Sequence, residues 1–234
     1  SLNHLLMYYA LQSIKELATH TNEVILFHSA TGKDSIALLD LCYPYFSKIT
    51  CVYMYMVKDL EHINKYIIYA QHKYPNITFL QVPHYALSQY RRDGVLGCRK
   101  DPTQRVYQLS NITEMVKKNT GIQWAIFGFK QSDSLNRRLM LRTYRDEMFA
   151  DSTHNLYPLS KYKNSDVEKY IKLKKLIPPI KYGEGQSQGT NVGNLPFLLY
   201  CKTFHPADYQ KVIKEFPQAE RIVFEYETYR DHES

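Results

Sequence analysis

The sequence has few cysteines and no long apolar run. Its four cysteines are widely separated and form no C-x-x-C pair, so we expect neither a zinc site nor an iron–sulfur cluster. No apolar stretch approaches the length of about 18 residues that spans a membrane. The first residues also lack the basic n-region and the small-residue cleavage site of a secretory signal. These absences favour a soluble, cytoplasmic protein with no membrane partner.

Positive charge is in excess. The formal net charge is +7 over 234 residues, which suits a polyanionic partner. That partner is a nucleotide, a sulfated or phosphorylated metabolite, or a nucleic acid, and the sign of the charge does not choose among them. We expect a main domain over residues 1–180 and a C-terminal extension over residues 181–234 packed on it.

Short apolar runs alternate with amphipathic segments along the chain. Runs typical of buried strands lie at residues 23–28, 49–57, 77–82 and 124–128. Apolar residues recur with helical spacing at residues 4–19, 34–43, 60–74, 104–119 and 166–175. This order predicts an α/β fold with a doubly wound, mostly parallel sheet flanked by helices. Ligands bind such sheets beyond the carboxyl ends of the strands.

Other segments carry weaker patterns. Residues 91–102 predict a basic, Gly-bearing loop, and residues 183–194 predict a Gly-rich loop that becomes ordered over a bound substrate. Near the C-terminus we expect a helix at 207–216 and a strand at 221–226.

The most informative segment is the turn between the run at 23–28 and the next helix. Such a turn directs free backbone N–H groups at one point, and the helix dipole adds positive charge there. Lys33 contributes a full charge and neighbouring hydroxyl groups contribute donors. We therefore expect a phosphate site formed by Ser29, Ala30, Thr31, Gly32, Lys33, Asp34 and Ser35.

Asp34 has two alternative roles at this turn. It either caps the helix or contacts a hydrated Mg²⁺ ion. The segment lacks the G-x-x-x-x-G-K-[ST] spacing of a Walker loop, and a plain helix cap after a tight turn is the alternative to a phosphate site.

Two motifs resemble a known family. Residues 28–35 resemble the modified phosphate loop, S-G-G-K-D-S in outline, of the N-type ATP pyrophosphatases and the related phosphoadenosine phosphosulfate (PAPS) reductase family. Residues 128–137 resemble the G-x-R-x-x-E-S-x-x-R segment of that family, with Lys130 in place of Arg and Asp133 in place of Glu.

A third motif follows in the family's order. Residues 157–170 resemble the segment P-L-x-x-W-x-x-x-D-V-x-x-Y, with Tyr162 in place of Trp. The phosphate loop itself departs from the outline, because the leading Ser of the family falls on Ala30. Ser29 replaces it if the turn carries one extra residue.

The resemblance implies an adenine nucleotide alpha hydrolase-like fold. It implies ATP, PAPS or adenylylsulfate as the substrate, with Mg²⁺ as a candidate ion. Nucleotide contacts beyond the loop are implied for Gly128, Lys130, Asp133, Ser134 and Arg137. The candidate catalytic residues are Lys33, Asp34, Lys130 and Arg137. A candidate substrate pocket comprises Cys98, Arg99 and Lys100, where neighbouring cations would lower the thiol pKa.

Three functions remain open. The first is an enzyme that acts at the α-phosphate of ATP and releases pyrophosphate, which depends on positioning and electrostatics. The second is a thiol-dependent PAPS or adenylylsulfate reductase, for whose C-terminal cysteine motif the chain offers only Cys201 with His205. The third is a non-catalytic nucleotide-binding subunit of a nucleic-acid sulfur-modification system. Nucleic acid and a redox or sulfur-donor protein are the candidate partners, and the oligomeric state stays open.

Overall fold

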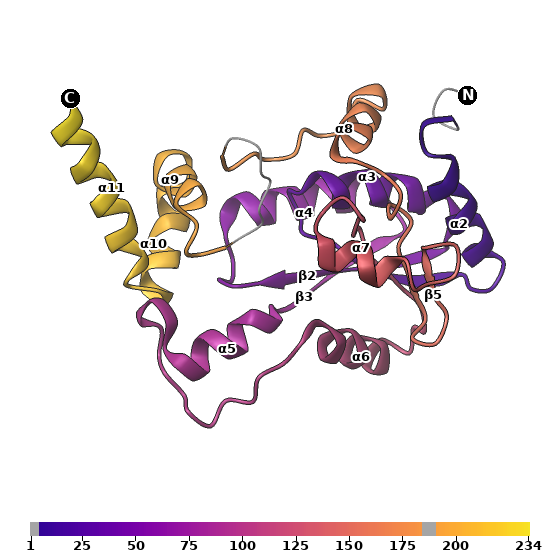
Figure 1. The fold of residues 1–234 in the computed structure, drawn as a ribbon, viewed down its shortest axis with the longest axis horizontal. Coiled ribbons are helices and arrows are strands. Elements are labelled where there is room, and N and C mark those ends of the chain that lie inside the picture. The colour runs from indigo at the N-terminus through magenta and orange to yellow at the C-terminus, as the bar shows by residue number, and fades with distance from the viewer. Residues whose placement is uncertain (1–4, 184–190) are drawn as a thin grey trace. The chain divides into compact units, whose positions relative to one another are not determined.

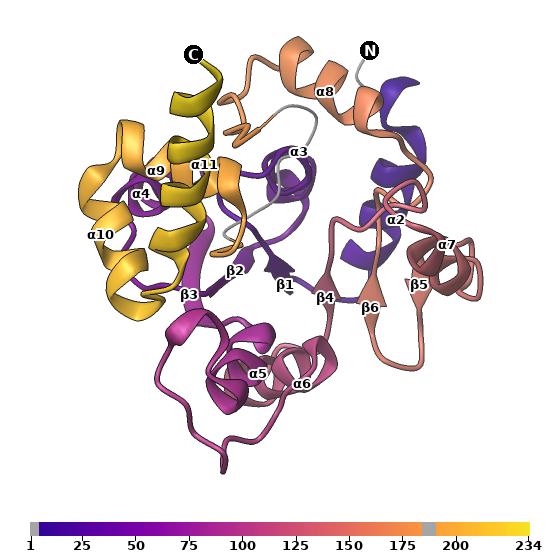
Figure 2. The ribbon, with the colours of Figure 1, turned by 60° about the vertical axis from the view of Figure 1, so that its left-hand side comes forward.

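The computed structural model describes residues 5–183 and 191–234. Within them the strands form one six-stranded sheet flanked by helices (Figure 1), in the order β3-β2-β1-β4-β6-β5 (Figure 2). The strands are β1 (Glu23–Phe27), β2 (Lys48–Tyr55), β3 (Ile77–Pro83), β4 (Ala125–Ile126), β5 (Phe149–Ala150) and β6 (Asn155–Leu156). β1 pairs in parallel with β2 and β4, and β4 with β6, whereas β5 is antiparallel to β6. The predicted α/β fold with a mostly parallel sheet is confirmed.

The chain divides into two compact units. The first contains Ser1–Tyr53, Tyr69–Gln81 and Thr113–Ile180, and the second contains Met54–Ile68, Val82–Ile112 and Lys181–Ser234. The expected division after residue 180 coincides with one of these boundaries, but two internal segments also belong to the second unit. The phosphate-loop motif and the motif at 128–137 both lie in the first unit.

In the first unit, helices cover both faces of the sheet. α2, α3 and α8 lie on one face and α6 lies on the other (Figure 2). Their bounds are α2 (Tyr8–Ala18), α3 (Lys33–Cys42), α6 (Leu109–Thr120) and α8 (Asn164–Leu173). α3 lies against the sheet, so every residue from Ser35 to Cys42 is buried. The start of α3 is thereby fixed directly beyond the carboxyl end of β1.

A buried carboxylate joins α3 to its neighbours. Asp40 accepts hydrogen bonds from the hydroxyl groups of Tyr170 in α8, at 2.6 Å, and of Tyr74, at 3.0 Å. Burial, together with the bond to Asp40, raises the pKa of Tyr170, so this hydroxyl stays protonated and donates. Tyr170 is the last residue of the third family motif, and in this chain it packs α8 against α3.

The second unit is mainly helical. Its helices are α5 (Tyr85–Asp93), α9 (Leu195–Phe204), α10 (Pro206–Glu215) and α11 (Ala219–Glu233). Fully buried Asp208 caps the start of α4 (Glu61–Lys73) by accepting the backbone N–H groups of Glu61 and His62 at 2.6 and 3.1 Å. The His62 ring bridges Asp208 at 2.7 Å and the hydroxyl of Tyr182 at 2.9 Å. Burial would raise the pKa of Asp208, but these donors lower it, so the carboxylate stays charged.

Two predicted elements are wrong. Residues 221–226 lie in α11 rather than in a strand, because Ala219 and Val223 are buried four residues apart and Arg221 pairs with Glu225 at 2.7 Å. Residues 91–93 belong to α5 rather than to a loop. The sequence signal for α5 was Gly94, which ends the helix with a left-handed φ of 69°.

Smaller differences concern boundaries and short elements. α6 begins at Leu109 rather than at residue 104, and α7 (Leu135–Leu141), α9 and the β5–β6 pair were not expected. Most of the expected Gly-rich loop, residues 184–190, lies outside the described residues. No helix in the described part of the chain combines the length and apolar character needed to cross a membrane.

Tyr170→Phe tests the Asp40 contact. The change removes a donor to a buried carboxylate and is expected to lower the free energy of unfolding by about 1–2 kcal/mol. Urea denaturation followed by circular dichroism measures this. Tyr229→Phe is the matched control because Tyr229 is largely exposed on α11. Equal unfolding midpoints for the two variants would contradict the assigned role of the contact.

Candidate functional site

The turn after β1 is held by a neutral histidine. His28 is buried, and its Nδ1 accepts the backbone N–H of Ala30 at 2.9 Å. The backbone N–H of His28 donates to the carbonyl of Val52 in β2 at 2.9 Å. Burial lowers the pKa of His28 to about 3, so the ring is uncharged at neutral pH and its Nδ1 can act as an acceptor. His28 therefore shapes the phosphate loop and does not add charge to it.

Two serines close the loop. The N–H of Ser29 donates to Oγ of Ser35 at 2.9 Å, and the two Oγ atoms are 3.0 Å apart. Between them Ala30 is fully buried with a φ of 64°, in the left-handed region. The turn thus accommodates one residue more than the S-G-G-K-D-S outline. Ser29, not Ala30, presents the hydroxyl group beside Ser35.

The first turn of α3 is open. Gly32 precedes the helix in an extended conformation and has no side chain that could cap the first N–H groups. A methyl group at Gly32 would lie 2.4 Å from Oγ of Ser29, so only glycine fits there without a shift of Ser29. N–H groups at a helix start, with a lysine side chain such as that of Lys33 beside them, can bind an anion, and a phosphate site here stays a prediction.

Lys130 lies in a clamp of two carboxylates. It is fully buried, and its Nζ is 2.6 Å from Oδ2 of Asp34 and 2.8 Å from Oδ1 of Asp133. Its backbone N–H also donates to Oδ2 of Asp133 at 2.8 Å. This Lys130 clamp connects the start of α3 with the segment after β4. The expected role of Lys130 as a cation facing phosphate does not match this burial, because its ammonium group is already paired twice.

Asp34 faces ammonium groups. In addition to Lys130, Nζ of Lys33 lies 3.4 Å from Oδ2. Oδ1 is buried and has no hydrogen-bond partner among the described residues, so it is the oxygen left for a further ligand. Gly128 approaches closely here, since a Cβ at Gly128 would lie 3.3 Å from Cβ of Asp34. A contact between Asp34 and Mg²⁺ stays a prediction.

The guanidinium group of Arg137 lies over an aromatic ring. Its guanidinium carbon lies 3.5 Å from the ring centroid of Phe129, which stacks on Phe127 and Tyr157. Its backbone N–H donates to Oγ of Ser134 at 3.1 Å, so Ser134 caps α7. No carboxylate of the described chain lies within salt-bridge distance of Arg137. Its fork of N–H donors therefore remains available for an anion.

The expected substrate pocket at Cys98, Arg99 and Lys100 belongs to the second unit. Sγ of Cys98 donates to the carbonyl of Tyr90 at 3.2 Å. Burial raises the pKa of the Cys98 thiol, and Arg91 only partly offsets this. The expectation that neighbouring cations lower this pKa is wrong. Arg99 and Lys100 are exposed.

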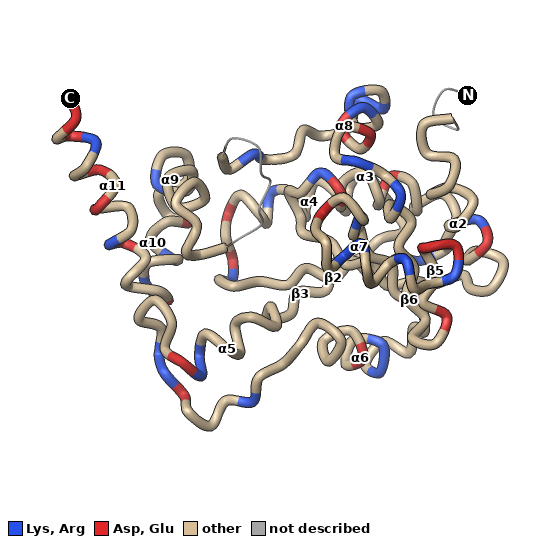
Figure 3. Tube along the Cα trace, viewed as in Figure 1, with Lys and Arg blue, Asp and Glu red and all other residues tan. Residues whose placement is uncertain are grey.

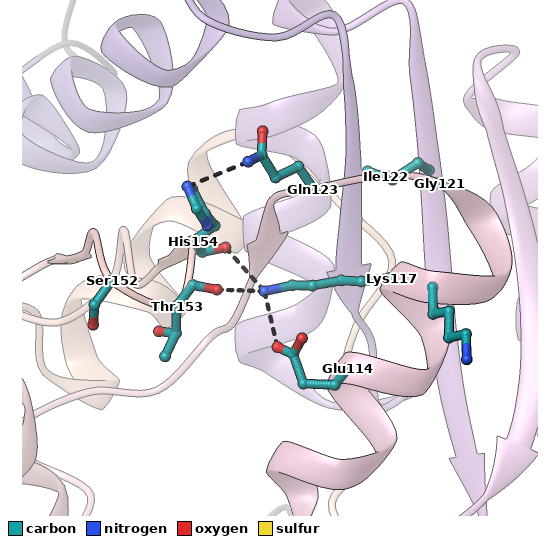
Figure 4. A pocket seen from close by; sticks show the side chains of 9 residues that line it. Glu114, Lys117, Gly121, Ile122, Gln123, Ser152, Thr153 and His154 are labelled. Carbon is teal, nitrogen blue, oxygen red and sulfur yellow. Dashed lines mark hydrogen bonds and ion pairs between the residues drawn. The ribbon is translucent and has the colours of Figure 1, made fainter.

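A shallow depression lies at the opposite edge of the sheet from the phosphate loop. It is lined by the end of α6 and by the turn that precedes β6 (Figure 4). Nζ of Lys117 points into the polar wall and donates to the carbonyl of Thr153 at 2.6 Å and to Oδ1 of Asn155 at 2.9 Å. The ammonium group is thus bound by the protein, and the depression lies at the amino ends of β4 and β6.

A parallel α/β sheet with an uncapped helix start beyond β1 defines a class of nucleotide-binding folds. The chain belongs to the phosphoadenosine phosphosulfate reductase domain family, whose model matches residues 24–187. The first unit therefore carries most of a domain known from enzymes. No curated protein sequence matches the chain significantly.

Solved structures show the same fold. An NH3-dependent NAD synthetase from Campylobacter jejuni, in complex with nitrate, has a TM-score of 0.52 and 10% identity, covering 92% of this chain and 93% of its own. The U34-tRNA thiolase NcsA from Methanococcus maripaludis has a TM-score of 0.48 and 11% identity, covering 94% of this chain and 80% of its own. At 10% identity the likeness to the NAD synthetase shows the fold alone, and the likeness to NcsA adds nothing to it.

The cofactor prediction requires a correction. NcsA holds a [4Fe–4S] cluster, so we withdraw the expectation that no iron–sulfur cluster accompanies this chain. That expectation relied on the missing C-x-x-C pair, but a fold can bring cluster ligands together from distant positions. Among the described residues, no group of three or more His, Cys, Asp or Glu side chains is placed to hold a metal ion.

Gly32→Ala tests the fit of the loop. The added methyl group displaces Ser29 and is expected to lower the free energy of unfolding by about 1–3 kcal/mol. In a Ser29→Ala background the contact is absent, so the same change should cost much less. A double-mutant cycle by urea denaturation measures the difference. Additive effects would show that Ser29 does not occupy the space above Gly32.

Lys130→Met tests the clamp. Removing the buried ammonium group leaves Asp133 without a cation and Asp34 with Lys33 alone, and is expected to destabilise the protein by about 3 kcal/mol. A triple variant that also carries Asp34→Asn and Asp133→Asn should regain much of this loss, because neither side chain then carries a charge. Thermal unfolding gives both values. Lys118→Met, a change at an exposed lysine, is the control. If Lys130→Met lost less stability than Lys118→Met, the clamp would be refuted.

Proposed function

We propose that the first unit binds ATP and acts at its α-phosphate. An acceptor attacks the α-phosphorus, the bond from that phosphorus to the oxygen bridging to the β-phosphorus breaks, and pyrophosphate leaves with the electron pair. The products are an adenylate of the acceptor and pyrophosphate. The observation that carries the proposal is the uncapped start of α3 inside the turn closed by Ser29 and Ser35.

Some of the site residues would bind the phosphates, and others would stabilise charge or hold the site in place. N–H groups of the first turn of α3, the serine hydroxyl groups and Lys33 would hold the β- and γ-phosphates. The guanidinium group of Arg137 would pair with a phosphate oxygen, with its plane fixed by Phe129. The Lys130 clamp keeps the segment that carries Arg137 attached to the start of α3. Such a site needs electrostatic positioning and no nucleophile from the protein.

The state of the cysteines favours adenylation over thiol-dependent reduction. A thiolate is the nucleophile in such a reduction. Cys42, Cys51 and Cys201 are fully buried, and burial raises the pKa of each, to about 12 for Cys201. The pKa of Cys98 is raised as well. All four thiols are therefore protonated at neutral pH, including Cys201, the expected candidate in the C-terminal segment.

Calorimetry with ATP, PAPS and adenylylsulfate tests the binding step. Lys33→Ala should weaken ATP binding about tenfold or more, which corresponds to about 1.4 kcal/mol, since it removes a charge beside the phosphates. Lys118→Ala, a change at an exposed lysine of α6, should leave the affinity unchanged. Equal ATP affinities of the wild type and the Lys33→Ala variant would refute the phosphate site.

Product analysis tests the reaction. Pyrophosphate formed from ATP in the presence of ammonia or sulfide as a simple acceptor would support adenylation. Sulfite formed from PAPS or adenylylsulfate with an added thiol would support the reductase instead. Nucleotide binding with neither product would indicate a non-catalytic subunit.

A further inference from the structure

Positive charge is concentrated on one segment of the first unit. Residues 161–175, which include α8, contain six lysines and two acidic residues. This segment thus supplies four of the seven net positive charges of the chain. Figure 3 shows lysines along α8. The lysines are Lys161, Lys163, Lys169, Lys172, Lys174 and Lys175, and all six are exposed.

These lysines lack acidic partners. Of the chain's other lysines, Lys65 and Lys202 pair with glutamates at 2.9 and 2.7 Å. No carboxylate of the described residues lies within 4.0 Å of the six. Asp166, one of the two acidic residues in the segment, instead accepts the backbone N–H of Lys163 at 2.8 Å. The segment therefore presents uncompensated charge to solvent.

Two exposed aromatic rings adjoin the lysines. Tyr8 and Tyr9, in the first turn of α2, are 49% and 52% exposed, and their rings pack edge to face. Nζ of Lys161 lies over the ring of Tyr9 at 4.9 Å from its centroid. The backbone N–H of Tyr9 donates to the hydroxyl of Tyr162 at 3.0 Å, which joins α2 to the lysine segment. The two rings thus lie beside Lys161, at the start of the lysine segment, and we call the six lysines and the two rings the α8 patch.

We propose that the α8 patch binds single-stranded nucleic acid. Phosphates of the strand pair with the lysines, and unstacked bases stack on Tyr8 and Tyr9. An anionic membrane or an acidic protein would use the charge but would have no planar bases to place on exposed tyrosine rings. α8 has ten residues and is about 15 Å long, enough to contact several successive nucleotides.

The patch and the phosphate loop belong to the same unit. α8 packs on α3, and the backbone N–H of Ile180, just beyond the patch, donates to the carbonyl of Thr31 at 3.1 Å. A strand on the patch is therefore bound by the unit that carries the phosphate loop. The proposal does not depend on the reaction at that loop.

Fluorescence anisotropy of the full chain with a labelled single strand of about 12 nucleotides, as RNA and as DNA, tests the proposal. The patch variant combines Lys169→Gln, Lys172→Gln and Lys174→Gln. Its matched control combines Lys48→Gln, Lys118→Gln and Lys214→Gln, three exposed lysines outside the patch. The patch variant should bind at least tenfold more weakly, and its salt slope should fall by about 2, or about 0.7 for each lost phosphate contact. The control should match the wild type.

A second variant measures how much the Tyr8 and Tyr9 rings contribute to oligonucleotide binding. Tyr8→Leu with Tyr9→Leu should weaken binding of the oligonucleotide severalfold while leaving inorganic polyphosphate, which has charge but no bases, unaffected. Circular dichroism confirms that each variant is folded. Equal losses in the patch variant and its control would overturn the proposal. The proposal would also be overturned if the patch variant lost binding to phosphatidylserine vesicles but bound the oligonucleotide as tightly as the wild type.

The same variants separate this proposal from the proposed function. The patch variant should bind ATP normally by calorimetry, and Lys33→Ala should bind the oligonucleotide normally. Failure of one proposal therefore leaves the other intact.

Discussion

A buried ammonium group holds the parts of the candidate site together. Taking Lys130 out of water costs several kcal/mol, and that cost is offset only because two carboxylates lie within 2.8 Å of its Nζ. One of them, Asp34, starts α3, and the other, Asp133, lies just before α7. The position of the open helix start relative to Arg137 depends on this pairing, as does the close approach of Gly128 to Asp34.

The turn at residues 29–35 differs in spacing from the S-G-G-K-D-S outline that it resembles. Ala30 takes a left-handed conformation, stabilised by its N–H bond to neutral His28, and Ser29 moves into the place beside Ser35. Burial of the His28 ring makes this bond possible, because a protonated ring has no acceptor nitrogen. Because the proposed phosphate site relies on backbone N–H groups, the identity of the residue at position 30 matters less than its conformation.

Burial of the thiols and exposure of the lysines bear on which of the proposed functions the chain can perform. The thiols are buried or half-buried with raised pKa values, which favours a reaction that needs no protein nucleophile. The unpaired cations of the α8 patch lie on the surface, where a polymer can reach them. The first unit thus combines a candidate phosphate site at the carboxyl edge of its sheet with an extended basic surface.

The periodicity of apolar residues predicted the order of most strands and helices. The strand, turn and helix at residues 23–42 likewise located the turn at residues 29–35. Both signals could be read from the sequence because they depend on neighbouring residues alone. The strand predicted at 221–226 failed because a short apolar run does not distinguish a strand from a helix until its packing is known. Only the tertiary structure could show that Lys130 is a counter-ion, since Asp34 is 96 positions away. The same holds for the contact of Tyr9 with Tyr162, 153 positions apart. Contacts of this kind arise when the sheet brings distant segments to one edge or face, and the sequence carries no local signal for them.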